Sequence, residues 1–452
     1  MAQKIIGIRR EDLDKVGEKR VSLSPKAVQS LLKSGCQVHL QSAVHPETGE
    51  SKRAYSDAEY LSVGAEVTED LSAASVIFGL KEVKAQHLIP ERPYLFFSHT
   101  HKGQVKNRPL LRSMVEKGIT LMDYELMVNA KRQRVITAFT YFAGYAGMVD
   151  SIWAYGKRLQ VQGTDHPFAK IPQSIEWEDL NRSKQAIKEV GEFIREHGTP
   201  QDLPPLITCF LGNGKTSTGA TEIYRFLPVQ AITLEELPDI FANGSRKQVY
   251  ELVLDVPQMF RLKAGSAYAN ESRSDSDLFQ LYLREPDEFE SNLDQVLPYL
   301  SILMNCIIWS PKFPRLISRT QAKEWLAAPH PLQVIGDITC DPEGAIQFSK
   351  ETWISDPVFL YDPATDKSAM GFDGEGVAVM AVTNLPCEFS ADASQQFSQD
   401  LGPYLHGIAG ADYAAEDPSA AGLPPEIQAS VILWKGKLQP NFTYMEAYLK
   451  ES

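Results

Sequence analysis

The sequence predicts an α/β protein with doubly wound parallel sheets, and three observations support this fold class. Short apolar runs alternate with amphipathic segments between residues 4 and 123. A second alternation begins at residue 206, where an apolar run breaks into a glycine loop and then a helix. A chain of 452 residues is also too long for one compact core, which predicts two domains or three.

The first part of the chain alternates regularly between strand and helix patterns. The pair Ser24-Pro25 is a capping residue followed by proline, and it begins a helix that ends at Ser34-Gly35. Shorter helices are expected at 56–61 and 108–117. The strands between them are expected at 4–8, 37–41, 75–80, 94–98 and 119–123. Strands that are separated by helices at this interval pair in parallel.

A long apolar helix is expected over about 143–159, and we interpret it as a connector between two lobes. Its small residues Gly144 and Gly147 allow another helix to pack closely against it. A polar loop at 162–182 and a charged amphipathic helix at 183–197 follow.

The stretch 206–220 has the pattern with which a mononucleotide-binding βαβ unit begins. A buried parallel strand at 206–211 leads into Gly212 and Gly214, which let the backbone turn tightly and approach a ligand. Thr216 or Ser217 can cap a helix that runs to about residue 226, and its N-terminus suits a pyrophosphate. The next strand is expected at 228–232.

This motif leaves other interpretations open. Gly219 comes one or two residues later than the third glycine of the common dinucleotide fingerprint. The segment 209–216 also has the outline of a phosphate-binding P-loop, but Cys209 stands where that loop needs glycine. A tight strand-to-helix turn without any ligand is the third interpretation.

The last part of the chain is less regular. A polar run at 264–277 precedes a helix that we expect from 288 to 309. Strands are expected at 333–338 and, after a glycine-rich turn at 371–376, at 377–382. A helix over about 390–405 and a surface loop at 410–425 complete the pattern.

Composition excludes several classes of partner. The formal net charge of −13 and the isoelectric point near 5.3 argue against nucleic acid or an anionic membrane as the main partner. The five cysteines are scattered and form no Cys-x-x-Cys pair, so neither a metal site nor a disulfide framework is expected. Without a leader or a membrane span in the pattern, we expect a cytoplasmic protein.

Four of the predicted strands end in ionisable side chains, where ligands of open α/β sheets bind. These strand ends carry Lys81 with Glu82, His99 with His101 and Lys102, Glu125, and Asp341. Any one of them could be an ordinary solvated loop residue, but four such ends at one edge favour a site.

Two arginines are candidates for binding carboxylates. Arg20 and Arg134 can form bidentate contacts, and Glu18 and Glu125 could balance them or bind an amino group. The alternative is a set of surface ion pairs, and the residues alone do not decide between the two.

The chain resembles a known family along an ordered set of segments. Ile8-Arg-Arg-Glu-Asp, Glu18-Lys-Arg-Val-Ser-Leu-Ser-Pro25, Gly79-Leu-Lys-Glu82 and Phe97-Ser-His-Thr-His-Lys102 are similar to the N-terminal lobe of alanine dehydrogenase, transhydrogenase and the saccharopine-forming dehydrogenases. Within that group the chain is similar to lysine-ketoglutarate reductase, the lysine-forming saccharopine dehydrogenase. The similarity continues through Tyr124-Glu125, Arg134-Val135, 143–148, the glycine loop, 314–316, 337–341 and 384–386.

The resemblance implies a reaction and a set of residue roles. It implies reversible condensation of L-lysine with 2-oxoglutarate and reduction of the imine to saccharopine by a nicotinamide cofactor. By the same resemblance Lys81 and His99 are the acid/base pair, and Asp341 is the aspartate near the nicotinamide. The implied binders of the keto-acid carboxylates are Arg20 and Arg134, and the polar groups around the amine are Glu18, Glu82 and Glu125.

The implied cofactor contacts follow the glycine loop and a later segment: Gly212, Asn213, Gly214, Lys215, Thr216, Ser217, Asn384 and Leu385. NADP(H) is favoured by resemblance alone, and NAD(H) is the alternative. Glu235 or Glu236 would favour NAD, whereas Arg246 and Lys247 could receive a 2′-phosphate.

The implied architecture has two Rossmann-like domains with a cleft between them. Residues 1–139 with 387–452 form the expected substrate domain, and residues 140–386 form the dinucleotide-binding domain. A monomer or homodimer acting on small molecules is expected, as a reductase without a following saccharopine-oxidising domain. The alternatives are a related amino-acid or imine dehydrogenase, a P-loop nucleotide hydrolase, and a catalytically silent sensor.

Overall fold

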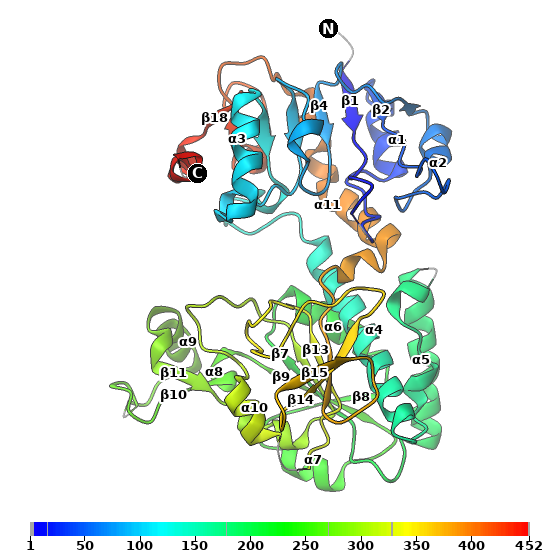
Figure 1. The fold of residues 1–452 in the computed structure, drawn as a ribbon, viewed down its shortest axis with the longest axis vertical. Helices are drawn as coiled ribbons and strands as arrows, with labels where there is room; N and C mark the ends of the chain where they lie inside the picture. Colours follow the sequence, from blue (N-terminus) through cyan, green and yellow to red (C-terminus); the bar gives the residue numbers. More distant parts are fainter. Residues whose placement is uncertain (1–3, 16, 178, 270, 327–328, 451–452) are drawn as a thin grey trace. The chain divides into compact units, whose positions relative to one another are not determined.

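The computed structural model describes residues 4–15, 17–177, 179–269, 271–326 and 329–450. The chain divides into two compact units (Figure 1). Unit 1 is Met1–Phe139 with Ser390–Ser452, and unit 2 is Thr140–Phe389. Each unit contains an eight-stranded sheet in which most neighbouring strands are parallel, so the predicted α/β class is confirmed. The cleft, and the roles assigned to the two domains, stay predictions.

The unit 1 sheet has the strand order β3-β2-β1-β4-β5-β6, with β17 antiparallel to β6 and β18 at the edge. Its strands are β1 Ile5–Ile8, β2 Gln37–Leu40, β3 Glu66–Val67, β4 Val76–Phe78, β5 Pro93–Leu95, β6 Thr120–Met122, β17 Val431–Trp434 and β18 Lys437–Leu438. Its helices are α1 Pro25–Lys33, α2 Asp57–Ser62, α3 Arg108–Glu116, α11 Ser390–Gly410, α12 Pro425–Gln428 and α13 Glu446–Lys450.

Successive residues of each strand in unit 1 face different helices, because side chains alternate across a sheet. Val76 and Phe78 belong to the core cluster that α1 and α11 cover. Ile77, between them, belongs to the cluster that α3 covers on the other face. Both faces of the sheet are therefore buried, which explains why its strands contain few polar residues.

The unit 2 sheet has the order β15-β14-β16-β13-β12-β7-β9-β8. Its strands are β7 Ile207–Leu211, β8 Val229–Ile232, β9 Val249–Leu254, β12 Ile302–Asn305, β13 Val334–Asp337, β14 Val358–Asp362, β15 Lys367–Met370 and β16 Val377–Met380. A separate two-stranded sheet pairs β10 Phe260–Leu262 with β11 Phe289–Ser291. The helices are α4 Ala138–Val161, α5 Leu180–His197, α6 Lys215–Tyr224, α7 Leu237–Asn243, α8 Val256–Met259, α9 Asp275–Arg284 and α10 Arg319–Trp325.

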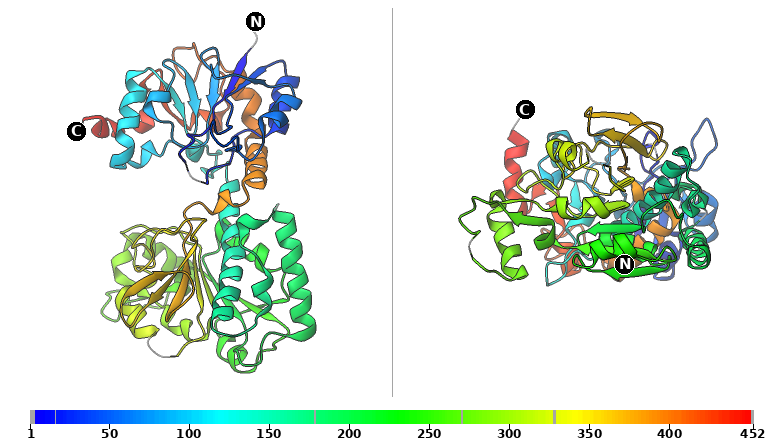
Figure 2. Two further views of the ribbon diagram at one scale, coloured as in Figure 1. Left: turned by 45° about the vertical axis from the view of Figure 1, so that its right-hand side comes forward. Right: turned by 90° about the horizontal axis from the view of Figure 1, so that it is seen from below.

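Helices lie on both faces of the unit 2 sheet (Figure 2). Helices α4 and α5 gather on one side, and α9 and α10 on the other. The apolar side chains of β7 divide accordingly. Cys209 packs in the cluster that includes α9 and α10, whereas the ring of Phe210 contacts Tyr224 of α6 on the opposite face.

The predicted helix at 288–309 is wrong. The segment instead forms β11, two short 3-10 turns and the central strand β12, which pairs with both β7 and β13. Pro298 lacks the N–H that a helix interior needs. The apolar run of β12 is fully buried, so sheet pairing on both sides decides its conformation.

The long helix α4 is confirmed, and the boundary between the two units falls at its second residue. Within unit 2 it packs closely against α6. A Cβ added to Gly144 would lie 2.1 Å from the carbonyl oxygen of Thr216, and one added to Gly219 would lie 2.4 Å from that of Tyr141. The predicted close packing against Gly144 is therefore present, and α6 is the helix that uses it.

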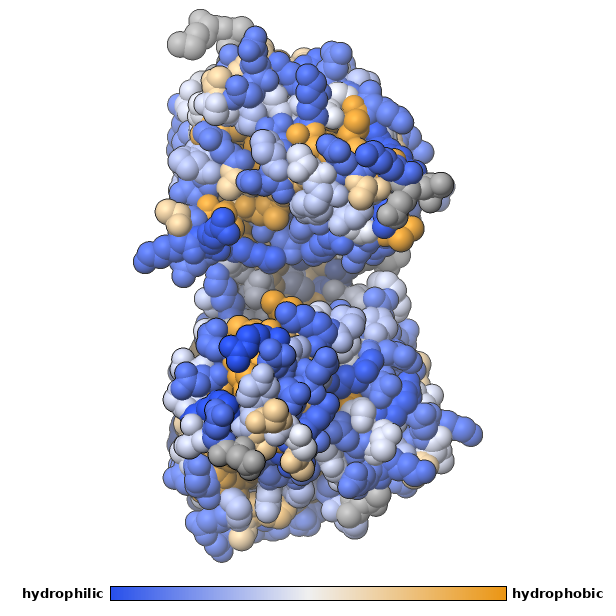
Figure 3. Space-filling model, turned by 90° about the vertical axis from the view of Figure 1, so that its left-hand side faces the viewer, coloured by the Kyte–Doolittle hydropathy of each residue, from blue (hydrophilic) through white to orange (hydrophobic). Residues whose placement is uncertain are grey.

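The molecular face shown in Figure 3 carries mostly hydrophilic side chains, with hydrophobic ones in small separate groups. Among the described residues, no helix has the length and the apolar character that crossing a membrane requires.

A pair of buried carboxyl groups lies inside unit 2. Asp150 of α4 is fully buried, and Glu388, which follows the 3-10 turn Leu385–Cys387, is 4% exposed. Burial raises the pKa of Asp150, against the hydrogen bond that the Ser174 N–H donates at 2.8 Å. Burial and the nearby charge of Asp150 raise the pKa of Glu388 well above its usual value. Folding therefore shifts both groups toward the protonated form.

We expect this pair to make the protein less stable as the pH rises. A carboxyl group whose pKa is raised by folding binds more protons in the native state, so its stabilising effect is lost above its native pKa. Asp150→Asn should therefore reduce the loss of unfolding free energy between pH 5 and pH 8 by about 1–3 kcal/mol. Chemical denaturation at both pH values measures this, with the exposed Asp165→Asn as control. An unchanged pH slope in Asp150→Asn would contradict the assignment.

Candidate functional site

The carboxyl ends of three neighbouring strands of unit 1 carry the predicted acid/base residues. Strands β4, β5 and β6 are parallel neighbours. Lys81 and Glu82 follow β4, His99 follows β5, and Glu125 follows β6. Ligands of open α/β sheets bind at this edge, so the strand order brings the predicted residues to the expected place.

His99 is oriented by Glu82. Its Nδ1 lies 2.5 Å from Glu82 Oε1, and its ring stacks on Phe97. Burial alone would raise the pKa of Glu82, but the hydrogen bond and charge of His99 outweigh it and lower the pKa to about 2. Because an ionised carboxylate can only accept, Nδ1 of His99 carries the proton and donates to Glu82. This leaves the chemistry of the ring to Nε2.

The backbone at His99 is unusual. Its φ angle is +53°, in the left-handed region that residues with a Cβ rarely adopt. Just before it, the Ser98 hydroxyl donates to Asp123 Oδ2 at 2.6 Å, which ties the end of β5 to the end of β6. Strain of this kind persists only where the surroundings hold it, and it concentrates at functional sites.

Lys81 lies near two carboxylates. Its charge lowers the pKa of both Glu18 and Glu82. Its backbone N–H donates to Glu11 Oε2 at 3.1 Å, and the Leu80 N–H donates to the other oxygen of Glu11 at 2.8 Å. The sequence interpretation did not single out Glu11, although its position just after β1, the strand next to β4, was a usable signal.

Arg20 forms a buried two-point contact with Glu18. The Arg20 Nε lies 2.9 Å from Glu18 Oε1, and Nη2 lies 2.6 Å from Oε2. The guanidinium also stacks 4.3 Å above the Phe139 ring. Burial opposes ionisation of Glu18, but the charge and hydrogen bonds of Arg20 lower its pKa to about 2. A substrate carboxylate would have to share Arg20 with Glu18.

Glu125 gathers three basic side chains. Lys102 Nζ lies 2.8 Å and Arg134 Nη2 2.7 Å from its oxygens, and His101 Nε2 lies at 3.5 Å. The Arg134 side chain is 53% exposed, in contrast to the buried Arg20. Burial lowers the pKa of His101, although Asp123 and Glu125 oppose this. Lys102 and His101 were noticed in the sequence only as strand-end residues, without a role.

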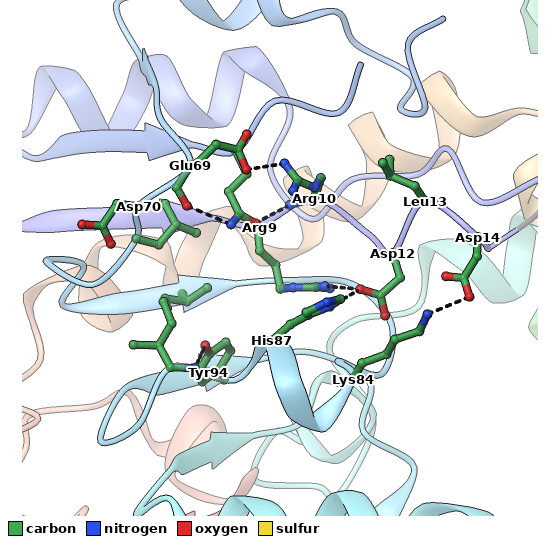
Figure 4. Close-up of a pocket in the computed structure, with 14 residues that line it drawn as sticks. Arg9, Arg10, Asp12, Leu13, Asp14, Glu69, Asp70, Lys84, His87 and Tyr94 are labelled. Carbon is green, nitrogen blue, oxygen red and sulfur yellow. Dashed lines mark hydrogen bonds and ion pairs between the residues drawn. The ribbon is translucent and has the colours of Figure 1, made fainter. Parts of the chain in front are cut away.

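A cavity of about 580 Å³ opens elsewhere on unit 1, beside the ends of β1 and β4 (Figure 4). Its charged side chains pair with one another. Arg9 and His87 both contact Asp12 at 2.9 Å, and Lys84 contacts Asp14 at 2.7 Å. None of the predicted site residues lines this cavity, and we assign it no ligand.

The glycine loop of unit 2 joins β7 to α6 through three residues, Gly212, Asn213 and Gly214. Gly212 has φ +92°, its N–H donates to the Leu254 carbonyl oxygen at 2.8 Å, and an added Cβ would lie 2.8 Å from Ile307. Around Gly214 an added Cβ would meet nothing within 4 Å. A backbone turn with open space beside it suits a pyrophosphate.

The predicted helix cap is wrong. The helix begins at Lys215 with Gly214 as its N-cap, so neither Thr216 nor Ser217 caps it. Gly144 of α4 packs against this first turn, where an added Cβ would lie 2.1 Å from the Thr216 carbonyl oxygen. Asn213, Gly214 and Lys215 are exposed, Thr216 is half-buried, and Ser217 is buried.

The other predicted residues of unit 2 follow β13 and β16. Asp341 comes after β13 and a left-handed Cys340, and burial together with the charge of Glu351 raises its pKa. Asn384 precedes the turn Leu385–Cys387, in which Leu385 is buried. Strands β7, β12 and β13 are parallel neighbours, so the glycine loop and Asp341 share the carboxyl edge of this sheet.

Three comparisons with known proteins support the resemblance seen in the sequence. Residues 7–146 match the family described as "Alanine dehydrogenase/PNT, N-terminal domain". The chain is 34% identical to an alpha-aminoadipic semialdehyde synthase of Arabidopsis thaliana, over 99% of this chain and 42% of that protein. It is 30% identical to the mitochondrial synthase of Bos taurus, over 98% of this chain and 47% of that protein.

A relative of similar length is the saccharopine dehydrogenase [NAD(+), L-lysine-forming] of Neurospora crassa, 25% identical over 90% of this chain and 91% of that protein. The chain spans less than half the length of the two synthases. Among solved structures, an L-alanine dehydrogenase has a TM-score of 0.58 at 17% identity, covering 98% of this chain and 99% of its own. A Sinorhizobium meliloti transhydrogenase has the same TM-score at 15% identity, covering 96% and 100%. The last two show the fold alone.

The contact between α4 and α6 yields a prediction about stability. Gly144→Ala should lower the unfolding free energy by about 1–3 kcal/mol, because the added methyl group clashes with the backbone of α6. Chemical denaturation measures this. The matched control is Gly410→Ala in α11, where an added Cβ meets nothing within 4 Å. Equal unfolding free energies of the two variants would contradict this prediction, because α6 could then move away from α4 without loss of stability.

Proposed function

We propose that the chain condenses L-lysine with 2-oxoglutarate and reduces the imine to saccharopine with NAD(P)H, reversibly, as a lysine-forming saccharopine dehydrogenase. The similarity to the proteins just described supports this. The observation that carries the proposal is the His99–Glu82 pair beside Lys81, at a sheet edge suited to a ligand. A related amino-acid or imine dehydrogenase with another substrate is the alternative.

In this proposal His99 moves protons during imine formation. The substrate ammonium loses one proton to become a nucleophile and a second one after it attacks the keto carbon, and the keto oxygen gains two protons, first becoming a hydroxyl and then leaving as water. With Nδ1–H held by the Glu82 anion, Nε2 of His99 can accept each of these protons in turn from the nitrogen and pass it to the oxygen. The Lys81 ammonium stabilises negative charge on the carbonyl oxygen by donating a hydrogen bond to it.

The remaining charges of unit 1 are proposed to bind the substrates. A dicarboxylate needs cations, and Arg134 is the more accessible of the two predicted arginines because its side chain is 53% exposed. It would exchange its contact with Glu125 for one with a substrate carboxylate. Arg20, held by Glu18, offers a fixed positive group. Glu18, Glu82 and Glu125 are the proposed partners of the lysine ammonium groups.

The residues of unit 2 fit a nicotinamide dinucleotide. The loop Gly212–Gly214 turns tightly beside open space, and α6 directs its free N–H groups toward it. Lys215, Thr216 and Ser217 are the proposed further contacts with the pyrophosphate, and Asp341, Asn384 and Leu385 those with the nicotinamide half. When bound, the cofactor supplies the hydride that reduces the imine. The resemblance favours NADP(H), and NAD(H) is the alternative.

The cytoplasm is the proposed location, although the name of the bovine relative includes the word mitochondrial. The proposed assembly is a monomer or homodimer.

A P-loop hydrolase is disfavoured by the length of the loop. A phosphate-binding P-loop needs a long loop that wraps the phosphates, whereas only three residues separate β7 from α6 here. Cys209, which would begin such a loop, lies fully buried inside β7 and pairs with Leu303 and Leu252. If the protein hydrolysed nucleoside triphosphates and Lys215→Ala abolished that activity, the result would support a P-loop hydrolase instead.

The proposed reaction gives a direct test. Purified protein should oxidise NADH or NADPH only when lysine and 2-oxoglutarate are both present. Lys81→Met and His99→Gln should each lower kcat by about 10²- to 10⁴-fold, because the first removes the ammonium that stabilises the carbonyl oxygen and the second removes the proton-transfer group. A spectrophotometric assay of the absorbance of the reduced nicotinamide measures both effects.

Lys106 and His406 are exposed, so Lys106→Met and His406→Gln are matched controls for Lys81→Met and His99→Gln. Both control variants should keep full activity. Full activity of Lys81→Met and His99→Gln would contradict the roles assigned to Lys81 and His99. Tight binding of these ligands without turnover would instead favour a catalytically silent sensor.

A further inference from the structure

The strand next to the glycine loop is not the next strand in the sequence. Strand β7 pairs with β9 in the register Leu211↔Leu254, and β8 pairs only with the far side of β9. The Gly212 N–H also donates to the Leu254 carbonyl oxygen at 2.8 Å. The residue that follows β9 beside the glycine loop is therefore Asp255.

The acidic residues suggested by sequence spacing lie farther away. Glu235 and Glu236 follow β8, which is the edge strand and lies two strand spacings from β7, roughly 10 Å. Glu236 is also engaged locally, because its Oε2 accepts a hydrogen bond from the Thr233 N–H at 2.8 Å. The spacing rule therefore selected residues at the end of β8, whereas the strand next to the glycine loop is β9.

The cations suggested for a 2′-phosphate lie at the opposite edge of the sheet. Arg246 and Lys247 precede β9, whose six residues span roughly 20 Å. The Arg246 carbonyl oxygen accepts a hydrogen bond from the Thr199 N–H at 2.8 Å, in the segment that leads into the amino end of β7. Neither side chain comes from the edge that carries the glycine loop.

Asp255 has the chemistry of a ribose binder. Its Oδ1 is buried and has no hydrogen-bond partner among the described residues. Asp255 and Gln258 form a capping box at the start of α8, in which the Asp255 N–H donates to Gln258 Oε1 at 3.0 Å, and Oδ1 is the carboxylate oxygen left without a partner among the described residues. Residues 252–260 contain no lysine or arginine, and Arg261, the next basic residue along the chain, pairs with Glu290 at 2.9 Å and Asp294 at 3.0 Å. A carboxylate accepts hydrogen bonds from the two hydroxyls of a ribose and repels a 2′-phosphate.

Resting on the proposed function, we propose that Asp255 binds the adenosine ribose of the cofactor and makes the chain prefer NAD(H) to NADP(H). The preference has two sources. The buried Oδ1 gains the hydrogen-bond partners that it lacks, and a phosphate dianion would meet the carboxylate anion.

The test is equilibrium binding of NADH and NADPH, followed by the fluorescence of the reduced nicotinamide and by calorimetry. Wild-type protein should bind NADH about 10-fold or more tightly than NADPH. Asp255→Asn and Asp255→Ser should bring the two affinities close together, and both residues can still begin the short helix α8. Thermal melting of each variant shows whether it is folded. The matched control Glu235→Gln should keep the wild-type ratio.

The outcomes separate the two proposals. Binding of both dinucleotides with a preference for NADPH, or a ratio that Asp255→Asn and Asp255→Ser leave unchanged, would overturn the role of Asp255 alone. Binding of neither dinucleotide by folded wild-type protein would overturn the proposed function itself.

Discussion

The candidate cofactor site depends on the close approach of α4 to α6. A Cβ at Gly144 would lie 2.1 Å from the Thr216 carbonyl oxygen, so only glycine allows the present distance between the helices. This contact holds α4 against the first turn of α6, the turn that directly follows the loop Gly212–Gly214. Because β7 lies between β12 and β9, the same loop is flanked by the strand end that leads to Asp255. Backbone packing here determines which side chains can meet a ligand.

In unit 1 the corresponding constraint is electrostatic. Burial alone would disfavour ionisation of Glu18 and Glu82, yet Arg20 lowers the pKa of Glu18 to about 2 and the hydrogen bond of His99 helps to lower the pKa of Glu82 to about 2. Each carboxylate then holds one basic side chain in place: Glu18 holds Arg20, and Glu82 holds His99. The Glu11 carboxylate fixes the backbone before and at Lys81. A proton-transfer site with fixed partners needs little rearrangement when its substrate binds.

The sequence predicted the features that depend on local chemistry. The capping pair at Ser24-Pro25, the glycine turn after β7 and the ionisable strand ends all follow from neighbouring residues, and the structure contains them. It failed where the strand order matters. Residues 302–305 were expected to be helical, because the pairing with β7 and β13 that makes them a strand is not visible in the local sequence. Asp255 was overlooked because β9, the strand that it follows, inserts between β7 and β8. No spacing rule within one segment carries that information.

Hydrogen–deuterium exchange with NADH and 2-oxoglutarate, added separately and together, tests the central claim most directly. The claim is that the carboxyl edges of both sheets bind the ligands. NADH should slow exchange in residues 211–218 and 254–258, and 2-oxoglutarate with NADH should also slow it in 79–82 and 97–102. Slower exchange confined to other segments, such as the cavity residues 9–14 and 84–89, would contradict the account.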